Sequence, residues 1–504
     1  MKRIKKGFVI MLSLAFFTLP AFVTTGCNLR DQGDLSITFF HGGYGQAWAH
    51  ALAARFYEEE GIRISINPDA NLQIQNMLEN GTEHDMIFSH NIPWELAAAR
   101  ANSLIVPICD VFDREVTPGV TFRDRMVPEL VNHARLDFNG RLENARYFRV
   151  PWTNGAGGLV YNAAMFERHG WKVPTTYEEL YALAGYIYER RIPVDPNDRR
   201  PNAPRIVPFA WKSNTYYWNY LVFNWWVQMQ GLESFYDFKN LTRGADSFNP
   251  ASDYMLPEAF GLWYNLVGRN PQFSFPNATG IHFMAAQQNF AMGHAAMMPN
   301  AQWFESEIRE FINPEIFRPV MMETPAAPGA KTDENGEVIK VNFNVSDDSI
   351  IIPALGLGGS PRSAARIENA KKFLIFMARP DNARLFTEQT MGVMLPFIYT
   401  EEDLEQIGNQ TDFSRSIFHI NTTHYKFDLI TQHPMVLANG ELFLAYGPGP
   451  GGGHFYGDAY RHNNPTTAST RFNYMGNFIT AHGRAVTNWN RWYTTANQRF
   501  EGLL

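Results

Sequence analysis

This 504-residue sequence contains a run of aromatic side chains, from Trp211 to Trp226, that could bind a ligand. Eight of these sixteen residues are Trp, Tyr or Phe, whereas the overall aromatic content of 14% would give about two. Aromatic rings stack on the flat apolar face of a ligand, while amides and carboxylates bond its polar rim. Because Tyr220, Phe223 and Val227 also have helical spacing, the run fits either a buried helix or a binding surface.

Signatures of catalysis and of metal or nucleotide binding are weak. The sequence has no H-E-x-x-H motif, and its fourteen histidines form no short-spaced cluster with cysteine. The glycine loop Gly447–Gly453 lacks the G-K-[ST] of a phosphate-binding loop. Asp347 and Asp348 are adjacent and would point to opposite faces of a strand, so they are a poor pair for glycan hydrolysis. We therefore expect no enzyme activity, no cofactor and no metal.

Composition narrows the class further. Charged residues make up 18%, below the roughly 25% usual in soluble chains, and the formal charge of −7 argues against a nucleic-acid partner. Two cysteines cannot hold a fold of this length together. We expect Cys109, within the apolar segment LIVPICDVF, to be a small core residue.

Residues 1–26 have the pattern of a secretion signal, with a basic start followed by an uncharged apolar stretch. The ending Thr24-Thr25-Gly26-Cys27 resembles the lipobox of bacterial lipoproteins, in which the cysteine is lipidated. Removal of four basic residues leaves 39 basic against 50 acidic side chains, a formal charge of −11. We expect residues 27–34 to be a tether, and the protein to be lipid-anchored in the cell envelope, on the extracytoplasmic side of the membrane (periplasm or cell surface).

Hydrophobic periodicity predicts an α/β fold. Apolar residues alternate from Leu35 to Phe39 and from Ile62 to Ile66, which favours strands, and Met86–Phe88 is a short apolar run. Helical spacing separates these segments, with Gly61 closing the first helix. This alternation of strand and helix is typical of a parallel sheet.

Other local signals predict turns, loops and helix starts. Asn139-Gly140 indicates a hairpin turn, residues 331–341 an exposed hairpin, and the Arg- and Pro-rich residues 190–208 a solvated loop. Thr175 and Glu178 have the spacing of a capping box. A helix over 363–379 would stop at Pro380, with Asp381 capping the next helix.

Three stretches carry a resemblance to the solute-binding proteins of bacterial ABC importers, in particular the class that serves sugars and oligosaccharides. They are VPWTNGAGGLVYNAAMFERHGWKVPTTYEEL (150–180), FAMGHAAMMPNAQWFESEI (290–308) and ARIENAKKFLIFMARPDNARLFTEQTMGVMLP (365–396). They are similar, in this order, to the family's hinge-crossing strand, its F-x-x-G-x-A-A-M motif and its late helices. The 190–208 insert and the chain beyond about 440 depart from the family pattern.

The resemblance implies a two-lobe periplasmic-binding-protein fold in which the ligand is held between the lobes. Lobe I is expected over 35–152 and 326–395, and lobe II over 153–325 and 396–504. The implied partners are a small-molecule carbohydrate and an ABC permease in the membrane, with the protein acting as a monomer. A sensor subunit with the same fold, a lipid-anchored glycan-degrading enzyme, and putrescine- or iron-binding relatives are the alternatives.

Candidate ligand-binding residues lie at strand ends, at the proposed hinge crossing and near the start of the aromatic helix, because ligand sites favour domain interfaces. They are His41, Gly42, Tyr44, Ser89, His90, Asn91, Trp94, Trp152, Asn154, Tyr216, Tyr217, Trp218, Asn300 and Trp303.

We predict that Cys27→Ser releases the protein from membranes, because lipidation through the sulfur would be its attachment. Fractionation of cells into membrane and soluble material measures this. Cys109→Ser is the matched control and should stay in the membrane fraction; persistent membrane association of the Cys27 variant would contradict the lipobox interpretation.

Overall fold

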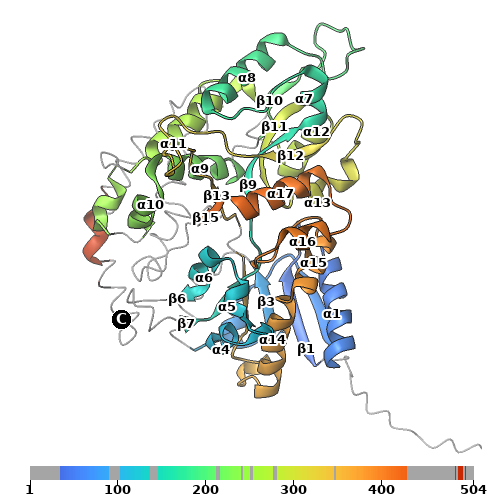
Figure 1. Ribbon diagram of the computed structural model, residues 1–504, viewed down its shortest axis with the longest axis vertical. Helices are drawn as coiled ribbons and strands as arrows, with labels where there is room; N and C mark the ends of the chain where they lie inside the picture. The colour runs from blue at the N-terminus through green and yellow to red at the C-terminus, as the bar shows by residue number, and fades with distance from the viewer. Residues whose placement is uncertain are drawn as a thin grey trace, which may run out of the picture. The chain divides into compact units, whose positions relative to one another are not determined.

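The computed structural model describes residues 34–89, 103–136, 146–211, 216–239, 242–249, 254–275, 281–345 and 348–427, together with 483, 486–491 and 494. Within these residues two β-sheets of four and five strands organise the chain (Figure 1). No helix in this part is both long and apolar enough to cross a membrane.

The first sheet has the order β2-β1-β3-β14-β8. Its strands are β1 (Leu35–Phe40), β2 (Ile64–Asp69), β3 (Met86–Ser89), β8 (Arg149–Pro151) and β14 (Ser349–Ile351). β1 pairs in parallel with β2 and β3, so that Leu35 lies opposite Ile64 and Ile37 opposite Met86. The predicted parallel α/β arrangement is confirmed here, while β14 runs antiparallel to both its neighbours.

Helices α1 (Ala47–Glu60), α14 (Ala364–Met377) and α15 (Pro380–Gln389) pack together beside this sheet (Figure 1). Gly61 ends α1 in the left-handed conformation, as predicted. The predicted cap of α15 is wrong: Pro380 occupies the first turn and no side chain caps the helix. Pro suits this position because its missing N–H has no partner in the first turn, and Asp381 instead forms an ion pair with Arg55.

The second sheet has the order β10-β11-β9-β12, with β9 antiparallel to β11 and β12. Its strands are β9 (Gly157–Asn162), β10 (Val207–Phe209), β11 (Ala295–Ala301) and β12 (Pro319–Met322). The surrounding helices are α7 (Ala163–His169), α8 (Tyr177–Arg190), α9 (Asn219–Gln230), α10 (Leu232–Lys239), α11 (Leu256–Trp263), α12 (Phe283–Ala291), α13 (Phe304–Ile308) and α17 (Asp412–Thr423). Every residue of α9 is buried, so the aromatic run mainly forms core.

Short elements complete the described chain: α2 (Ile74–Asn80), α4 (Cys109–Phe112), α5 (Phe122–Arg125), α6 (Pro128–Ala134), α16 (Glu401–Glu405), β4 (Glu115–Thr117), β5 (Val120–Thr121), β6 (Arg135–Leu136), β7 (Arg146–Tyr147), β13 (Val341–Phe343) and β15 (Tyr425–Phe427). β6 and β7 pair antiparallel on either side of the predicted Asn139-Gly140 turn, which itself lies outside the described residues. The Gly447–Gly453 loop also lies outside them. Cys109 was expected to be a buried core residue, but it is only half-buried.

The start of α8 and the hairpin over residues 331–341 bear on two further predictions. The helix cap lies one residue later than predicted and is not a capping box. The Thr176 hydroxyl accepts from the Glu179 N–H at 3.2 Å, but the Glu179 carboxylate accepts from the N–H of Thr175, the residue before the cap, at 2.7 Å. The exposed hairpin is confirmed by the antiparallel bridge between Thr332 and Val338.

Two segments bear on the expected division into lobes. Phe397 and Tyr399, in the segment 396–504 expected in lobe II, lie in the core around the first sheet. Phe343, in the segment 326–395 expected in lobe I, packs on Phe223 of α9, at 5.0 Å between ring centroids. The order of the family's motifs along the chain predicts which segments cross between the sheets. It does not determine the sheet against which each crossing segment packs. We propose the division into lobes with residues 326–345 and 396–407 exchanged.

Segments that join the two sheets lie against one another. The Trp152 N–H donates to the Asp348 carbonyl at 3.1 Å, and the Asn154 N–H to the Met394 carbonyl at 2.8 Å. Gly157, at the start of β9, has no room for a side chain, because a Cβ there would lie 2.2 Å from Val345 Cγ1 and 2.7 Å from a ring carbon of Tyr220. Close approach of backbone to neighbouring groups therefore shapes this junction.

A buried lysine lies in the same junction. Lys426 Nζ donates to the Gly155 carbonyl and to Asn342 Oδ1, both at 3.1 Å, and the residue is 1% exposed. Burial lowers the pKa of Lys426 from its ordinary value of 10.5 to about 7, with Glu129 acting weakly in the opposite direction. The junction therefore contains a cation whose charged form is disfavoured.

We predict that Asp85→Ala lowers the free energy of unfolding by about 3–5 kcal/mol, because it leaves buried Arg362 without its counter-ion. Asp85 is fully buried and also accepts from the Ser36 N–H and from Arg366. Urea unfolding measures the change. Glu167→Ala, which breaks an exposed pair with Arg318, is the matched control and should cost no more than about 1 kcal/mol; equal losses would contradict the prediction.

Lys426 predicts a pH dependence of stability. Between pH 7 and 10.5 the unfolded chain keeps the lysine proton that the folded chain releases, so the free energy of unfolding contributed by Lys426 rises with pH across this window. We expect the free energy of unfolding of Lys426→Met to rise less than that of wild type between pH 7 and pH 10. Exposed Lys372→Met is the control and should keep the wild-type slope; an unchanged slope in the Lys426 variant would argue against the shifted pKa.

Candidate functional site

A chain of polar side chains links the loop after β1 to the loop after β11. The Tyr44 hydroxyl donates to Asp348 Oδ2 at 3.2 Å and lies 3.3 Å from the Thr153 hydroxyl. Gln302 Nε2 donates to both hydroxyls, at 3.4 Å to Tyr44 and 3.2 Å to Thr153. All four side chains are buried, and Oε1 of the Gln302 amide has no hydrogen-bond partner among the residues that the structure describes. The junction thus gathers donors and acceptors from both sheets.

Beside these polar groups lies an aromatic surface. The Trp303 ring centroid is 5.7 Å from that of Tyr217 and 6.4 Å from that of Tyr220. Trp303 and Tyr217 are half-buried, whereas Tyr220 is buried. Burial and the nearby Glu307 carboxylate raise the pKa of the Tyr217 hydroxyl, so it is a neutral donor and acceptor. These rings offer a partly open aromatic face.

The loop HGGYG, residues 41–45, lies close to this aromatic surface at Gly43. A Cβ at Gly43 would lie 2.5 Å from Trp303 Cβ and 3.3 Å from Glu307 Oε1. Any side chain at Gly43 would therefore push the loop away from Trp303. The glycine allows the loop of the first sheet to contact the start of α13.

Glu307 adds a carboxylate to the site. Its Oε2 accepts a hydrogen bond from Gln287 Nε2 at 2.8 Å. Burial raises the pKa of Glu307, and the Gln287 hydrogen bond partly opposes this effect. Glu307 lies one helical turn after Trp303, since its N–H donates to the Trp303 carbonyl at 3.1 Å. The ring and the carboxylate therefore belong to one short segment.

The structure brings together some of the predicted site residues. Tyr44, Tyr217 and Trp303 meet at the junction, and exposed His41 and Gly42 precede Tyr44 in the loop. Asn154, Asn300 and Ser89 are buried at strand ends and crossings, so their contact with a ligand stays a prediction. His90, Asn91, Trp94 and Cys27 lie outside the described residues, as does the side chain of Tyr216.

Two of the predicted ligand-binding residues, Trp152 and Trp218, are buried in the structure, and their contact with a ligand stays a prediction. Trp152 is fully buried among Phe39, Trp48 and Phe88, with ring centroids 5.4–6.4 Å away, and forms core of the first sheet. Trp218 is 3% exposed, with its ring 5.5 Å from that of Phe260, and belongs to the core around α9 and α11. Both rings are covered by apolar packing, so neither presents a face to a ligand in this structure.

Sequence reasoning missed the polar residues of the site. Thr153, Gln302, Asp348 and Glu307 are not aromatic and have no motif spacing that marks them. Only their closeness in sequence to predicted site residues could have identified them. Thr153 follows Trp152 at the predicted crossing, and Gln302 and Glu307 lie on either side of Trp303.

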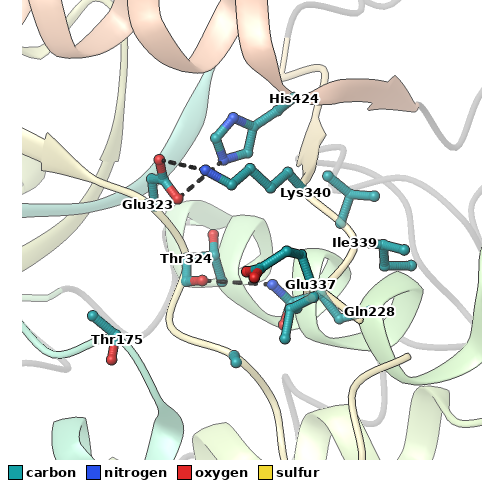
Figure 2. A pocket seen from close by; sticks show the side chains of 11 residues that line it. Thr175, Gln228, Glu323, Thr324, Glu337, Ile339, Lys340 and His424 are labelled. Carbon is teal, nitrogen blue, oxygen red and sulfur yellow. Dashed lines mark hydrogen bonds and ion pairs between the residues drawn. The ribbon is translucent and has the colours of Figure 1, made fainter. Parts of the chain in front are cut away.

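A separate polar cavity of about 270 Å³ lies near the end of β12. Figure 2 shows Glu323 beside Lys340 and His424, with Thr324 and Gln228 on the adjoining wall. Glu323 Oε1 is 3.2 Å from Lys340 Nζ, and burial lowers the pKa of His424 to about 4, so this histidine is neutral at physiological pH. Among the described residues, the cavity is lined by no Trp, Tyr or Phe and by none of the predicted site residues.

Metal binding finds no support in the described part of the chain. No group of three or more His, Cys, Asp or Glu side chains in these residues is arranged to hold an ion. The groups described at the junction can serve aromatic stacking and hydrogen bonding.

Comparisons with known proteins agree with this architecture. The chain is similar to a solved chitin oligosaccharide binding protein (TM-score 0.60, 12% identity, covering 91% of this chain and 99% of that one). It is also similar to the bacterial solute receptor AcbH, described as preferring β-D-galactopyranose exclusively (0.57, 14%, 90% and 99%), and to the protein RafE in complex with raffinose (0.55, 16%, 89% and 98%). These similarities show the two-lobe binding-protein fold. No curated protein matches the sequence.

The family comparison covers the second sheet and all of the first sheet except β1. The model of the family described as bacterial extracellular solute-binding protein matches residues 42–384, more than half of the sequence. The chain therefore belongs to the bacterial extracellular solute-binding protein family.

Proposed function

We propose that this protein captures a sugar or oligosaccharide between its two lobes and delivers it to an ABC permease. The observation that carries the proposal is the meeting of the Trp303 and Tyr217 rings with the polar chain of Tyr44 and Gln302 at the junction. A sugar offers an apolar ring face for stacking and a rim of hydroxyls for hydrogen bonds, and this set of groups matches both. The sugar-binding descriptions of the three structural relatives support the same class of ligand.

Binding would work by a shift between open and closed arrangements of the lobes. The Gln302–Tyr44 and Gln302–Thr153 bonds connect the loop after β11 to the first sheet and the crossing, so they would form on closure. A ligand that contacts both loops favours the closed arrangement by its differential affinity. Permease recognition of the closed form would then lead to release of the sugar.

No bond is made or broken in this proposal. Glycan hydrolysis needs two opposed carboxylates on either side of the scissile bond. Of the junction carboxylates described here, Asp348 accepts from Tyr44 and Glu307 accepts from Gln287, so each is held by a hydrogen bond within the protein. A lipid-anchored glycan-degrading enzyme is therefore the less favoured function, and a sensor subunit would use the same closure.

The setting of this function is part of the proposal. The mature chain would begin at Cys27, carry lipid there, and act as a monomer on the extracytoplasmic side. A tethered carrier stays close to its permease, which raises the effective concentration of loaded protein at the membrane.

We predict that a cognate sugar changes the intrinsic tryptophan fluorescence of the protein, and that Trp303→Ala weakens its binding more than tenfold, about 1.4 kcal/mol, because the stacking face is lost. Titration of a panel of mono- and oligosaccharides finds the ligand, and calorimetry measures the affinity of the variant.

Trp171→Ala is the matched control for this experiment, since Trp171 is also half-buried but stacks on His169, with ring centroids 4.8 Å apart. It should keep wild-type affinity. If no sugar binds while the protein cleaves a glycan at catalytic rates, the enzyme function replaces the proposed one; unchanged affinity of Trp303→Ala removes that ring from the site.

A further inference from the structure

We propose that Glu307 determines which sugar is bound, by accepting hydrogen bonds from ligand hydroxyls through Oε1. This inference rests on the proposed function. It begins from the unequal surroundings of the two carboxylate oxygens. Oε2 is held by Gln287 Nε2 at 2.8 Å, whereas Oε1 points toward the HGGYG loop, where a Cβ at Gly43 would lie 3.3 Å from it.

The position of Glu307 relative to the aromatic surface supports the proposal. Residues four apart on a helix lie on the same face, and the N–H of Glu307 bonds the carbonyl of Trp303. A sugar ring stacked on Trp303 would therefore have its hydroxyl rim within reach of this carboxylate. The nearby Tyr217 hydroxyl is neutral and can bond a neighbouring hydroxyl of the same ligand.

The charge of Glu307 is otherwise poorly compensated. Within the described residues no Lys, Arg or His forms an ion pair with it, and Gln287 is its one hydrogen-bonding side chain there. A carboxylate largely removed from water is costly unless donors surround it. Sugar hydroxyls are such donors, and the raised pKa of Glu307 is consistent with a site that lacks them before binding.

Gln287 has the role of a positioning residue. Its amide is buried and holds Oε2, which fixes the orientation of the carboxylate and leaves Oε1 directed toward the loop. A fixed acceptor distinguishes ligands by the presence of a hydroxyl at one position, because an analogue without that hydroxyl leaves the acceptor unpaired.

Calorimetry of Glu307→Gln with the sugar identified from the panel, and with its monodeoxy analogues, tests the inference. Hydrogen bonds to charged groups contribute enough for a loss of about 10- to 100-fold in affinity in the variant. Wild type should reject one or more deoxy analogues by a similar factor, and Glu307→Gln should bind that analogue and the parent sugar almost equally. Glu310→Gln, which alters an exposed carboxylate three residues away, is the control and should behave as wild type.

The outcomes separate the two proposals. If wild type binds none of the sugars, the proposed function fails. If wild type binds a sugar and Glu307→Gln keeps both its affinity and its discrimination among deoxy analogues, only the role of Glu307 is overturned. Should the Gln variant fail to fold, Glu307→Asp keeps the charge but withdraws the carboxylate by one methylene; it should lose affinity and change the deoxy profile, and wild-type behaviour of a folded Asp variant overturns the inference.

Discussion

Burial of the chain segments that cross between the two sheets is the constraint on which the rest of this structure depends. Backbone groups in these segments leave their sheets but stay away from water, so they need other partners. Side-chain amides supply them: Asn344 Oδ1 accepts from the Gly155 N–H at 2.9 Å, and Asn342 Nδ2 donates to the Gly157 carbonyl at 2.9 Å. Lys426 completes the set at the Gly155 carbonyl. The pattern explains why glycine and asparagine dominate here, where apolar residues could not satisfy the backbone.

The crossing network also determines where the binding loops meet. Thr153 lies between the crossing bonds of Trp152 and Asn154, and its hydroxyl is held by Gln302 from the end of β11. Neutral hydrogen bonds of this kind contribute only about 0.5–1.5 kcal/mol each. A few such bonds hold the loops together weakly enough that a ligand contacting both sides could shift their arrangement, as a reversible carrier requires.

The elements that the sequence predicted best were those with the longest and most regular hydrophobic pattern. Alternation from Leu35 to Phe39 and the helical spacing that follows identified the first sheet, because each periodicity reports which face is buried. Helix starts were less certain, since Thr175 and Thr176 both fit a cap and only the backbone geometry selects Thr176. The division into lobes stays a prediction, because local sequence says nothing about which of two neighbouring cores receives a crossing segment.

The binding site was the least predictable part, and the tryptophans show why. Trp152, Trp218 and Trp303 are the same residue type, but apolar neighbours cover almost all of the first two, so their surface is already used in folding. Trp303 lies in the turn between β11 and α13, directly before the first residue of α13, and its ring is only half covered. Its remaining area is free to gain about 25 cal/mol for each Å² that a ligand covers. Polar groups on the same turn, Gln302 and Glu307, then determine which ligand can bind. The proposed site therefore differs from the core by a partly exposed ring beside these polar groups, and not by its density of aromatic residues.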